Sequence, residues 1–254
     1  MTDKTKNLSD LYLKKSKHSS YQKIHPVVEK FLPNIELIHG KYEAERQLLI
    51  EKSVDFKGKT VLEIGCNTGY FTAAAALNEA LAIDAYEGNA EHCQFIEITR
   101  TLIPNGQAIN VHNEYYIPSN KTDLKYDICI FLNVLHHLGD DFLGNEKNIR
   151  SAKKEMAQYL TELSFKANTL IFQMGFNWKG NKQLPLFQNG EKHELISFIE
   201  ESTNKNYYLE KIFCSTSKDG EYMEYLDSNL NTTRNNEIGE FLNRPLFILR
   251  SKNH

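Results

Sequence analysis

Hydrophobic and polar positions along the chain predict short buried strands separated by amphipathic helices. Seven apolar runs have the length of strands: 59–64, 80–86, 107–111, 126–132, 169–174, 209–214 and 246–250. The last two are expected to complete the sheet as a closing pair. Apolar residues at helical spacing predict helices at 70–78, 90–102, 146–166 and 191–201. This alternation predicts an α/β fold, a doubly wound, Rossmann-like, mostly parallel sheet of seven strands with helices on both faces.

The first 56 residues follow a different pattern, which looks helical. His25-Pro26 predicts a turn or a helix start, and residues 43–54 have the apolar spacing of a helix. We therefore predict an N-terminal helical cap, or lid, over residues 1–56 and a main domain over residues 57–254.

Composition is that of an ordinary globular protein. Of the 254 residues, 41% are hydrophobic and 25% are charged, and no apolar run is long enough to span a membrane. The polar N-terminus lacks the apolar core of a secretory signal and the four cysteines form no CxxC pair, so we expect a cytoplasmic protein without disulfides. The net charge of −3 gives no reason to expect a DNA partner, and the oligomeric state stays open.

A loop with two glycines follows the first predicted strand. The segment Val61-Leu-Glu-Ile-Gly-Cys-Asn-Thr-Gly-Tyr-Phe-Thr72 places Gly65 and Gly69 ahead of a helix, where glycine lets the backbone approach a ligand. Dinucleotide enzymes have GxGxxG at this place, whereas this chain has GxNxG. The spacing therefore disfavours NAD.

This loop resembles motif I of the class I S-adenosylmethionine-dependent methyltransferases, commonly written (D/E)xGxGxG. Glu63 matches the acid, and Asn67 replaces the middle glycine, which a left-handed turn tolerates. The resemblance implies that S-adenosylmethionine is the cofactor and that Glu63 helps to anchor its amino group. It also places the following loop and helix residues at the cofactor: Gly65, Cys66, Asn67, Gly69, Tyr70 and Phe71.

The next two strands supply candidates for the nucleoside part of the cofactor. A ribose needs a carboxylate about 20 residues after the glycine loop, and Asp84 and Glu87 compete for this role. Gly88-Asn89 predicts a turn directly after the strand, which favours Glu87. The resemblance places Asn113 and Glu114 where family members often hold the adenine amino group; a solvated loop is the alternative.

The segment after the fourth strand, Leu132-Asn-Val-Leu-His-His-Leu138, also resembles the family. The resemblance places Asn133 at the cofactor and makes His137 the common histidine, with His136 at a variable position. A neutral imidazole can accept a proton during methyl transfer, so both histidines are catalytic candidates, with a structural role as the alternative. Strand five ends without an acid, so we expect no metal.

Acceptor recognition in this family comes from the cap and from insertions after strands four and five. The candidates in this chain are Tyr21, His25, Tyr42, Arg46 and Trp178. Arg46 either clamps a phosphate or carboxylate or lies on a helix surface. No Asp/Asn-Pro-Pro-Tyr or Pro-Cys segment follows strand four, which disfavours amino methylation of adenine and cytosine C5 chemistry.

We therefore predict methyl transfer from S-adenosylmethionine to an oxygen of a small-molecule or sugar-like acceptor, phosphorylated or not. A diffuse resemblance to bacterial methyltransferases of surface-polysaccharide pathways favours a saccharide. Two alternatives stay open. One is an RNA (tRNA) methyltransferase whose basic residues 1–30 contact the RNA backbone, and the other is a non-catalytic nucleoside-binding module.

Overall fold

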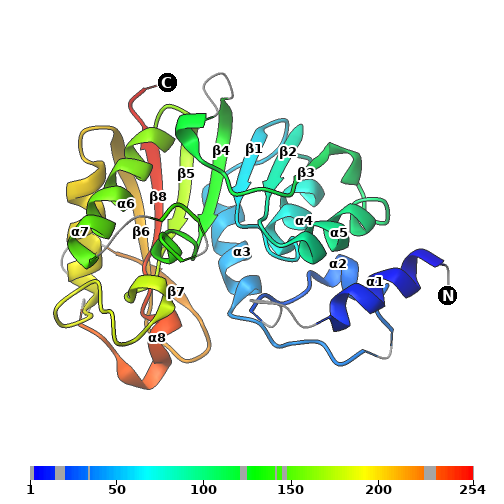
Figure 1. Cartoon of the computed structure of the whole chain (residues 1–254), viewed down its shortest axis with the longest axis horizontal. Coiled ribbons are helices and arrows are strands. Elements are labelled where there is room, and N and C mark those ends of the chain that lie inside the picture. Colours follow the sequence, from blue (N-terminus) through cyan, green and yellow to red (C-terminus); the bar gives the residue numbers. More distant parts are fainter. Residues whose placement is uncertain are drawn as a thin grey trace. The chain divides into compact units, whose positions relative to one another are not determined.

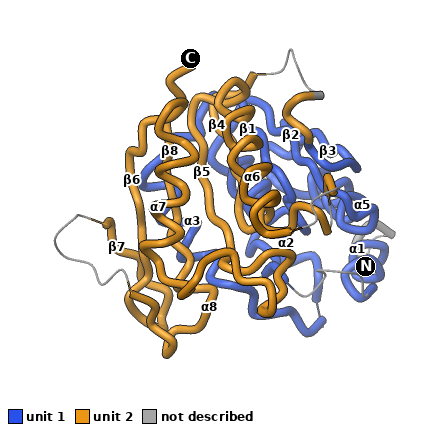
Figure 2. Tube along the Cα trace, turned by 60° about the vertical axis from the view of Figure 1, so that its left-hand side comes forward, with its two compact units in different colours: residues 1–116 blue, residues 117–254 orange. Residues whose placement is uncertain are grey.

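The computed structural model describes residues 3–14, 21–33, 35–120, 125–140, 142–144, 148–225 and 233–253 (Figure 1). The chain divides into two compact units, an N-terminal unit (Met1–Tyr116) and a C-terminal unit (Ile117–His254) (Figure 2). The predicted cap, residues 1–56, lies wholly within the N-terminal unit, and its separate role stays a prediction.

Three parallel strands lie at the centre of the N-terminal unit. β1 (Thr60–Ile64) pairs with β2 (Ala82–Tyr86), which pairs with β3 (Ile109–His112). α4 (Tyr70–Leu77) packs on β1 and β2, and α5 (Ala90–Thr99) packs on β3. The strands run parallel, so the loops after all three begin at the same edge.

The segment before β1 is helical only in part. It contains α1 (Asp3–Leu13), α2 (Pro26–Glu29) and α3 (Glu43–Ser53), whereas residues 21–25 and 35–40 are not helical. The prediction of a helical segment is therefore wrong for these two stretches, which lack the apolar spacing of a helix.

Close contacts between segments accompany the non-helical course of the two stretches. At Gly40, where φ is +74°, an added Cβ would lie only 2.4 Å from the Cβ of Lys23. The hydroxyl of Tyr12 on α1 also accepts the backbone N–H of Ile38 at 3.0 Å. A backbone N–H that a helix would have paired within itself thus bonds to another segment.

The C-terminal unit contributes five strands with mixed directions. Its strands follow the spatial order β4 (Tyr126–Leu132), β5 (Ala167–Gln173), β8 (Leu246–Ser251), β6 (Tyr207–Ser215) and β7 (Tyr222–Glu224). β4 and β5 are parallel, and the other pairs are antiparallel.

The two longer helices of the C-terminal unit, α6 (Ile149–Leu163) and α7 (Lys192–Thr203), pack against each other. The side chain of Asn148 caps the start of α6 by accepting the N–H of Ser151. The remaining elements are short: α8 (Gly239–Leu242), η1 (Gly106–Ala108), η2 (Pro118–Asn120), η3 (Leu135–His137), η4 (Trp178–Gly180) and η5 (Asn236–Ile238).

The α/β class is confirmed, and every predicted strand is present. The predicted number of seven strands is wrong, because the described residues contain eight. The additional strand is β7, whose three residues are too few to show a periodic pattern. No helix in the described part of the chain is long and apolar enough to cross a membrane.

Candidate functional site

The loop between β1 and α4 is the centre of the candidate cofactor site. Gly65, Asn67 and Gly69 have φ values of +70, +52 and +80°. Asparagine is among the few residues other than glycine that adopt such values readily, which explains Asn67 at the middle position. At Gly69 an added Cβ would lie 3.0 Å from Ile96 on α5, so the close approach of this helix also requires glycine.

Every backbone N–H of this loop, from residue 65 to residue 70, donates a hydrogen bond within the N-terminal unit. The donor and acceptor residues are Gly65–Tyr86, Cys66–Tyr86, Asn67–Glu87, Thr68–Asn67, Gly69–Cys66 and Tyr70–Gln22. A loop that binds a pyrophosphate needs N–H groups directed at the anion. The loop donors are already used, so the geometry fits a ligand without phosphates.

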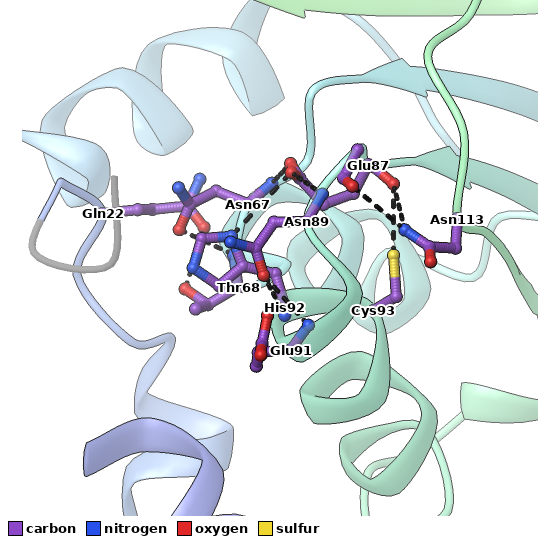
Figure 3. A network of polar contacts seen from close by, with 10 residues as sticks. Gln22, Asn67, Thr68, Glu87, Asn89, Glu91, His92, Cys93 and Asn113 are labelled. Carbon is purple, nitrogen blue, oxygen red and sulfur yellow. Dashed lines mark hydrogen bonds and ion pairs between the residues drawn. The ribbon is translucent and has the colours of Figure 1, made fainter. Parts of the chain in front are cut away.

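Glu87 follows β2 and joins the loop to the start of α5 (Figure 3). Its Oε2 accepts the N–H of Asn67 at 2.8 Å, and its Oε1 accepts the N–H of Asn89 at 2.9 Å. An ionised carboxylate has about four acceptor positions, which leaves capacity for the two hydroxyls of a ribose. Asp84 instead contacts His112 at 3.0 Å, a side chain of the neighbouring strand. The geometry therefore favours Glu87 over Asp84 as the proposed ribose ligand.

Glu63 lies buried on β1, next to the loop. Burial raises the pKa of its carboxyl to about 8; the hydrogen bond from Thr72 opposes this shift and the nearby Glu87 adds to it. The Thr72 hydroxyl donates to Oε2 of Glu63 at 2.5 Å. A buried acid of this kind is well suited to receive an ammonium group, which would favour its ionised form. Burial also raises the pKa of the Cys66 thiol well above its usual value, so Cys66 is unsuited to act as a nucleophile.

The loop after β3 reaches back to Glu87. The side-chain amide of Asn113 donates to the backbone carbonyls of Glu87 and Gly88 at 3.1 and 3.2 Å, and Glu114 is exposed. Tyr115, which the sequence did not indicate, packs its ring on Gly88, where an added Cβ would lie 2.3 Å from the ring. Tyr115 is 48% exposed and so offers an aromatic surface beside the proposed ribose ligand.

Gln22 enters the same loop from the N-terminal segment, as Figure 3 shows. Its Oε1 accepts the N–H of Tyr70 at 3.0 Å and the hydroxyl of Thr68 at 3.3 Å. Tyr70 is the first residue of α4 and Gly69 has no capping side chain, so Gln22 supplies the missing acceptor. No local motif reveals this contact, because Gln22 and Tyr70 lie 48 residues apart.

Gln22→Ala is expected to destabilise the N-terminal unit by about 1–2 kcal/mol, because a buried N–H at the start of α4 loses its acceptor. Urea unfolding checks this value. The matched control is Gln107→Ala, which removes an exposed hydrogen bond to Asn105 and should cost little. Equal effects of the two substitutions would argue against a capping role for Gln22.

The aromatic residues near the loop pack inward. Tyr70 and Phe71 are buried, and their ring centroids are 5.2 Å apart. His25 packs on Tyr70 with ring centroids 4.9 Å apart, and its Nδ1 accepts the N–H of Val27. Burial lowers the pKa of His25, which favours the neutral ring that this hydrogen bond requires. Tyr21 is half-buried. Ligand contacts by these side chains stay predictions.

Arg46 is not on a helix surface. It is 2% exposed and pairs with the buried carboxylate of Glu43 at 3.4 Å. Its guanidinium also donates to the backbone carbonyls of Lys41 and Tyr42, the residues that precede α3. Tyr42 has a φ of +59°, so these bonds hold a turn that its backbone adopts rarely. The predicted roles of Arg46 and Tyr42 in acceptor binding are not tested by this arrangement.

In the C-terminal unit, Asn133 follows β4 with a φ of +62°. Its Nδ2 donates to Oε1 of Gln173 at 2.9 Å, and its Oδ1 accepts from Nη1 of Arg244 at 2.9 Å. The side chain thus connects the carboxyl ends of two parallel strands to the segment before β8. The predicted role of Asn133 at the cofactor stays a prediction.

The two histidines differ in their surroundings. His136 is buried, and its Nδ1 accepts the N–H of Gly175 at 3.1 Å. A neutral imidazole whose Nδ1 accepts carries its proton on Nε2. His137 is half-buried, with its ring centroid 4.4 Å from that of His136, and packs against Gly180. The neutral form of His136 is therefore a hydrogen-bond donor at Nε2.

Comparison with known proteins supports the fold and nothing finer. No family model matches the chain, and no curated protein matches its sequence. A crystal structure of WbdD matches with a TM-score of 0.60 and 17% identity, over 97% of this chain and 47% of that chain. Another, of "the bifunctional kinase-methyltransferase WbdD", matches with a TM-score of 0.56 and 16% identity, over 97% of this chain and 46% of that chain.

A third match is to a Listeria monocytogenes protein named as an S-adenosylmethionine-dependent methyltransferase. Its TM-score is 0.50 at 13% identity, over 82% of this chain and 99% of that chain. The chain has a class I methyltransferase fold. It spans about half the length of the WbdD chains that it matches.

The residues of this methyltransferase fold suit S-adenosylmethionine. The cofactor carries an ammonium group, a ribose and no phosphate. The N-terminal unit offers a buried acid, Glu63, a second acid, Glu87, and a loop whose N–H groups are already bonded. Within the described residues no three His, Cys, Asp or Glu side chains gather as a metal ion would require, and the expectation of no metal stays a prediction.

Trp178, predicted to contact the acceptor, is buried after β5 in this methyltransferase fold. Its Nε1 donates to the carbonyl of Leu138 at 2.7 Å and so ties this segment to the one that follows β4. Trp178→Phe is expected to lower the free energy of unfolding by about 1–3 kcal/mol, because a buried carbonyl loses its donor. Urea unfolding measures this loss, and calorimetry should show unchanged cofactor affinity. A variant as stable as the wild type would contradict this structural role.

Proposed function

We propose that the protein is a methyltransferase that uses S-adenosylmethionine to methylate an oxygen of a small-molecule or sugar-like acceptor. One observation carries the proposal. A glycine loop without available N–H donors lies between a buried acid, Glu63, and a second acid, Glu87. This combination suits a cationic nucleoside and does not suit a dinucleotide.

When bound, S-adenosylmethionine supplies a methyl group on a positively charged sulfur. The residues of this chain bind and orient it. Glu63 receives the ammonium group, and Glu87 accepts hydrogen bonds from the ribose hydroxyls. Asn113 and Tyr115 lie next to Glu87 and Gly88 and border the proposed position of the adenine.

Methyl transfer to a hydroxyl needs alignment of the acceptor and removal of one proton. Nδ1 of His136 accepts from Gly175, so neutral His136 serves as a donor that orients the acceptor. Proton acceptance is then assigned to His137. No covalent intermediate with the protein is required.

Calorimetry with S-adenosylmethionine tests the cofactor, with NAD as the matched control ligand. We expect S-adenosylmethionine to bind with a Kd of about 1 mM or tighter and NAD not to bind, because the loop lacks donors for a pyrophosphate. Mass spectrometry after incubation with methyl-labelled cofactor and panels of sugars, sugar phosphates and nucleosides tests the acceptor. Tight binding of NAD, or no binding of S-adenosylmethionine, would contradict the proposal.

A further inference from the structure

Arg244 stands at the ligand-binding edge of the C-terminal sheet. It precedes β8, which runs antiparallel to β5, with Leu246 opposite Gln173 at the carboxyl end of β5. The carbonyl of Arg244 accepts a hydrogen bond from the side chain of Gln173 at 3.0 Å. Open α/β sheets bind their ligands at the carboxyl ends of the parallel strands. A guanidinium is therefore held where the acceptor is expected.

Gly175 brings this guanidinium close to an imidazole. An added Cβ on Gly175 would lie 2.9 Å from Nε2 of His136 and 3.1 Å from Cζ of Arg244. Because both atoms lie near one common point, they are at most about 6 Å apart. Two oxygens of a single phosphate or carboxylate group can reach both side chains across such a distance.

The guanidinium of Arg244 is only partly satisfied. Nη1 donates to Asn133 at 2.9 Å, and Nη2 pairs with Oε1 of Glu240 at 2.7 Å. Its Nε is buried and has no hydrogen-bond partner within the described part of the chain. A buried N–H without an acceptor is unfavourable, and an anionic oxygen would remove this cost.

His136 presents the matching chemistry. Its Nδ1 is held by the N–H of Gly175, so the neutral ring carries a proton on Nε2. A proton on Nε2 suits an anion and does not suit a cation. Two donors of different kinds, a guanidinium and an imidazole, thus lie on either side of one glycine.

We propose that Arg244 and His136 bind an anionic group of the methyl acceptor, a phosphate ester or a carboxylate. The proposal rests on the proposed function, because it identifies the substrate class of the same enzyme. Glu240 is part of the site, because its carboxylate offsets the charge of Arg244 and sets the strength with which an anion is held.

A purely structural role for Arg244 makes a different prediction. If Arg244 only held the turn at Asn133, removing either Arg244 or its partner Glu240 would loosen the same network. If Arg244 binds an anion, removing the carboxylate of Glu240 strengthens binding and removing the guanidinium weakens it. The two substitutions then act in opposite directions.

The experiment titrates the full chain with inorganic phosphate and with acetate, followed by NMR or calorimetry. Each titration is done with and without S-adenosylhomocysteine. The variants are Arg244→Gln and Glu240→Gln. The matched controls are Arg250→Gln and Glu210→Gln, because Arg250 and Glu210 form a similar ion pair, 2.7 Å long, on strands of the same sheet.

We expect at least one of the two anions to bind the wild type saturably. Arg244→Gln should weaken this binding by roughly ten- to a hundred-fold, and Glu240→Gln should strengthen it several-fold. The two controls should leave it unchanged. If Arg244→Gln does not fold, Arg244→Lys and Glu240→Gln test the anion site instead. Lysine keeps the positive charge but lacks the planar set of N–H donors that arginine has.

Three results would overturn the anion site: no saturable binding of either anion, unchanged binding in Arg244→Gln, or weaker binding in Glu240→Gln. Calorimetry with S-adenosylmethionine on the same samples keeps the two proposals apart. Cofactor binding without anion binding would refute only the proposed anion site. Anion binding that depends on Arg244, without cofactor binding, would refute the proposed function and support the anion site.

Discussion

Glu87→Ala is expected to lower the affinity for S-adenosylmethionine about a hundred-fold or more. The carboxylate is assigned to the two ribose hydroxyls, and it also holds the N–H groups of Asn67 and Asn89 at 2.8 and 2.9 Å. A hydrogen bond to a charged group contributes about 1.5–3 kcal/mol, so the loss of two such bonds accounts for this factor. Calorimetry measures the affinity directly.

Asp84→Ala is the matched control. Asp84 lies on the strand that leads to Glu87, but its carboxylate is bonded to His112 and Asn110 on the neighbouring strand. We expect cofactor affinity to change by no more than about three-fold in this variant. Thermal unfolding of both variants separates a lost ligand contact from a lost fold. A large loss of cofactor affinity in Asp84→Ala together with a small loss in Glu87→Ala would show that Asp84 binds the ribose.

The strands and the glycine loop could be predicted because their physical cause is local. A buried parallel strand is a continuous apolar run, and β4 shows this over its last five residues, 128–132. The turn at Asn67 needs a positive φ, and the sequence offers asparagine there between two glycines. Such signals are complete within a few residues and need no knowledge of the tertiary structure.

Two of the contacts described above, one in each unit, have no local signal. Gln22 and Tyr70 are 48 residues apart, and Arg244 and Asn133 are 111 residues apart. Each contact depends on how segments far apart in the sequence pack together. Neither Gln22 nor Arg244 lies in a motif, so only the three-dimensional arrangement identifies them.

The motif also suggested a ligand role for several large aromatic side chains. Packing in the interior explains the presence of these side chains equally well. Tyr70, Phe71 and Trp178 are buried, and burial of aromatic surface is itself a large source of stability. A motif shows that a segment is near a ligand, but it does not show which side chains of that segment point inward. The backbone of Tyr70 belongs to the loop through its N–H, while its ring packs on His25.

Binding of S-adenosylmethionine at pH 7 is expected to release close to one proton from Glu63. Burial raises the pKa of this carboxyl to about 8, so it is mostly protonated at pH 7 in the free protein. An ammonium group beside it favours the carboxylate, which lowers the pKa and expels the proton. Calorimetry in buffers of different ionisation enthalpy measures the proton count. Glu63→Gln should release none and bind about ten-fold more weakly.

The same pKa fixes the direction of a stability change in the free protein. The pKa is about 8 in the folded state against an ordinary 4.5, so the folded state holds the proton more tightly. The contribution of Glu63 to stability is full below pH 4.5 and is lost as the pH rises to about 8. At about 1.36 kcal/mol for each pKa unit, the loss is on the order of 5 kcal/mol.

Urea unfolding at several pH values tests this loss. Glu63→Gln should flatten the pH dependence and be the more stable protein at pH values above the pKa of Glu63. The matched control is Glu97→Gln, which removes an exposed carboxylate paired with Arg100 and should keep the wild-type profile. A wild type whose stability does not fall over this range would show that Glu63 is ionised in the folded protein, and no proton would then be released on binding.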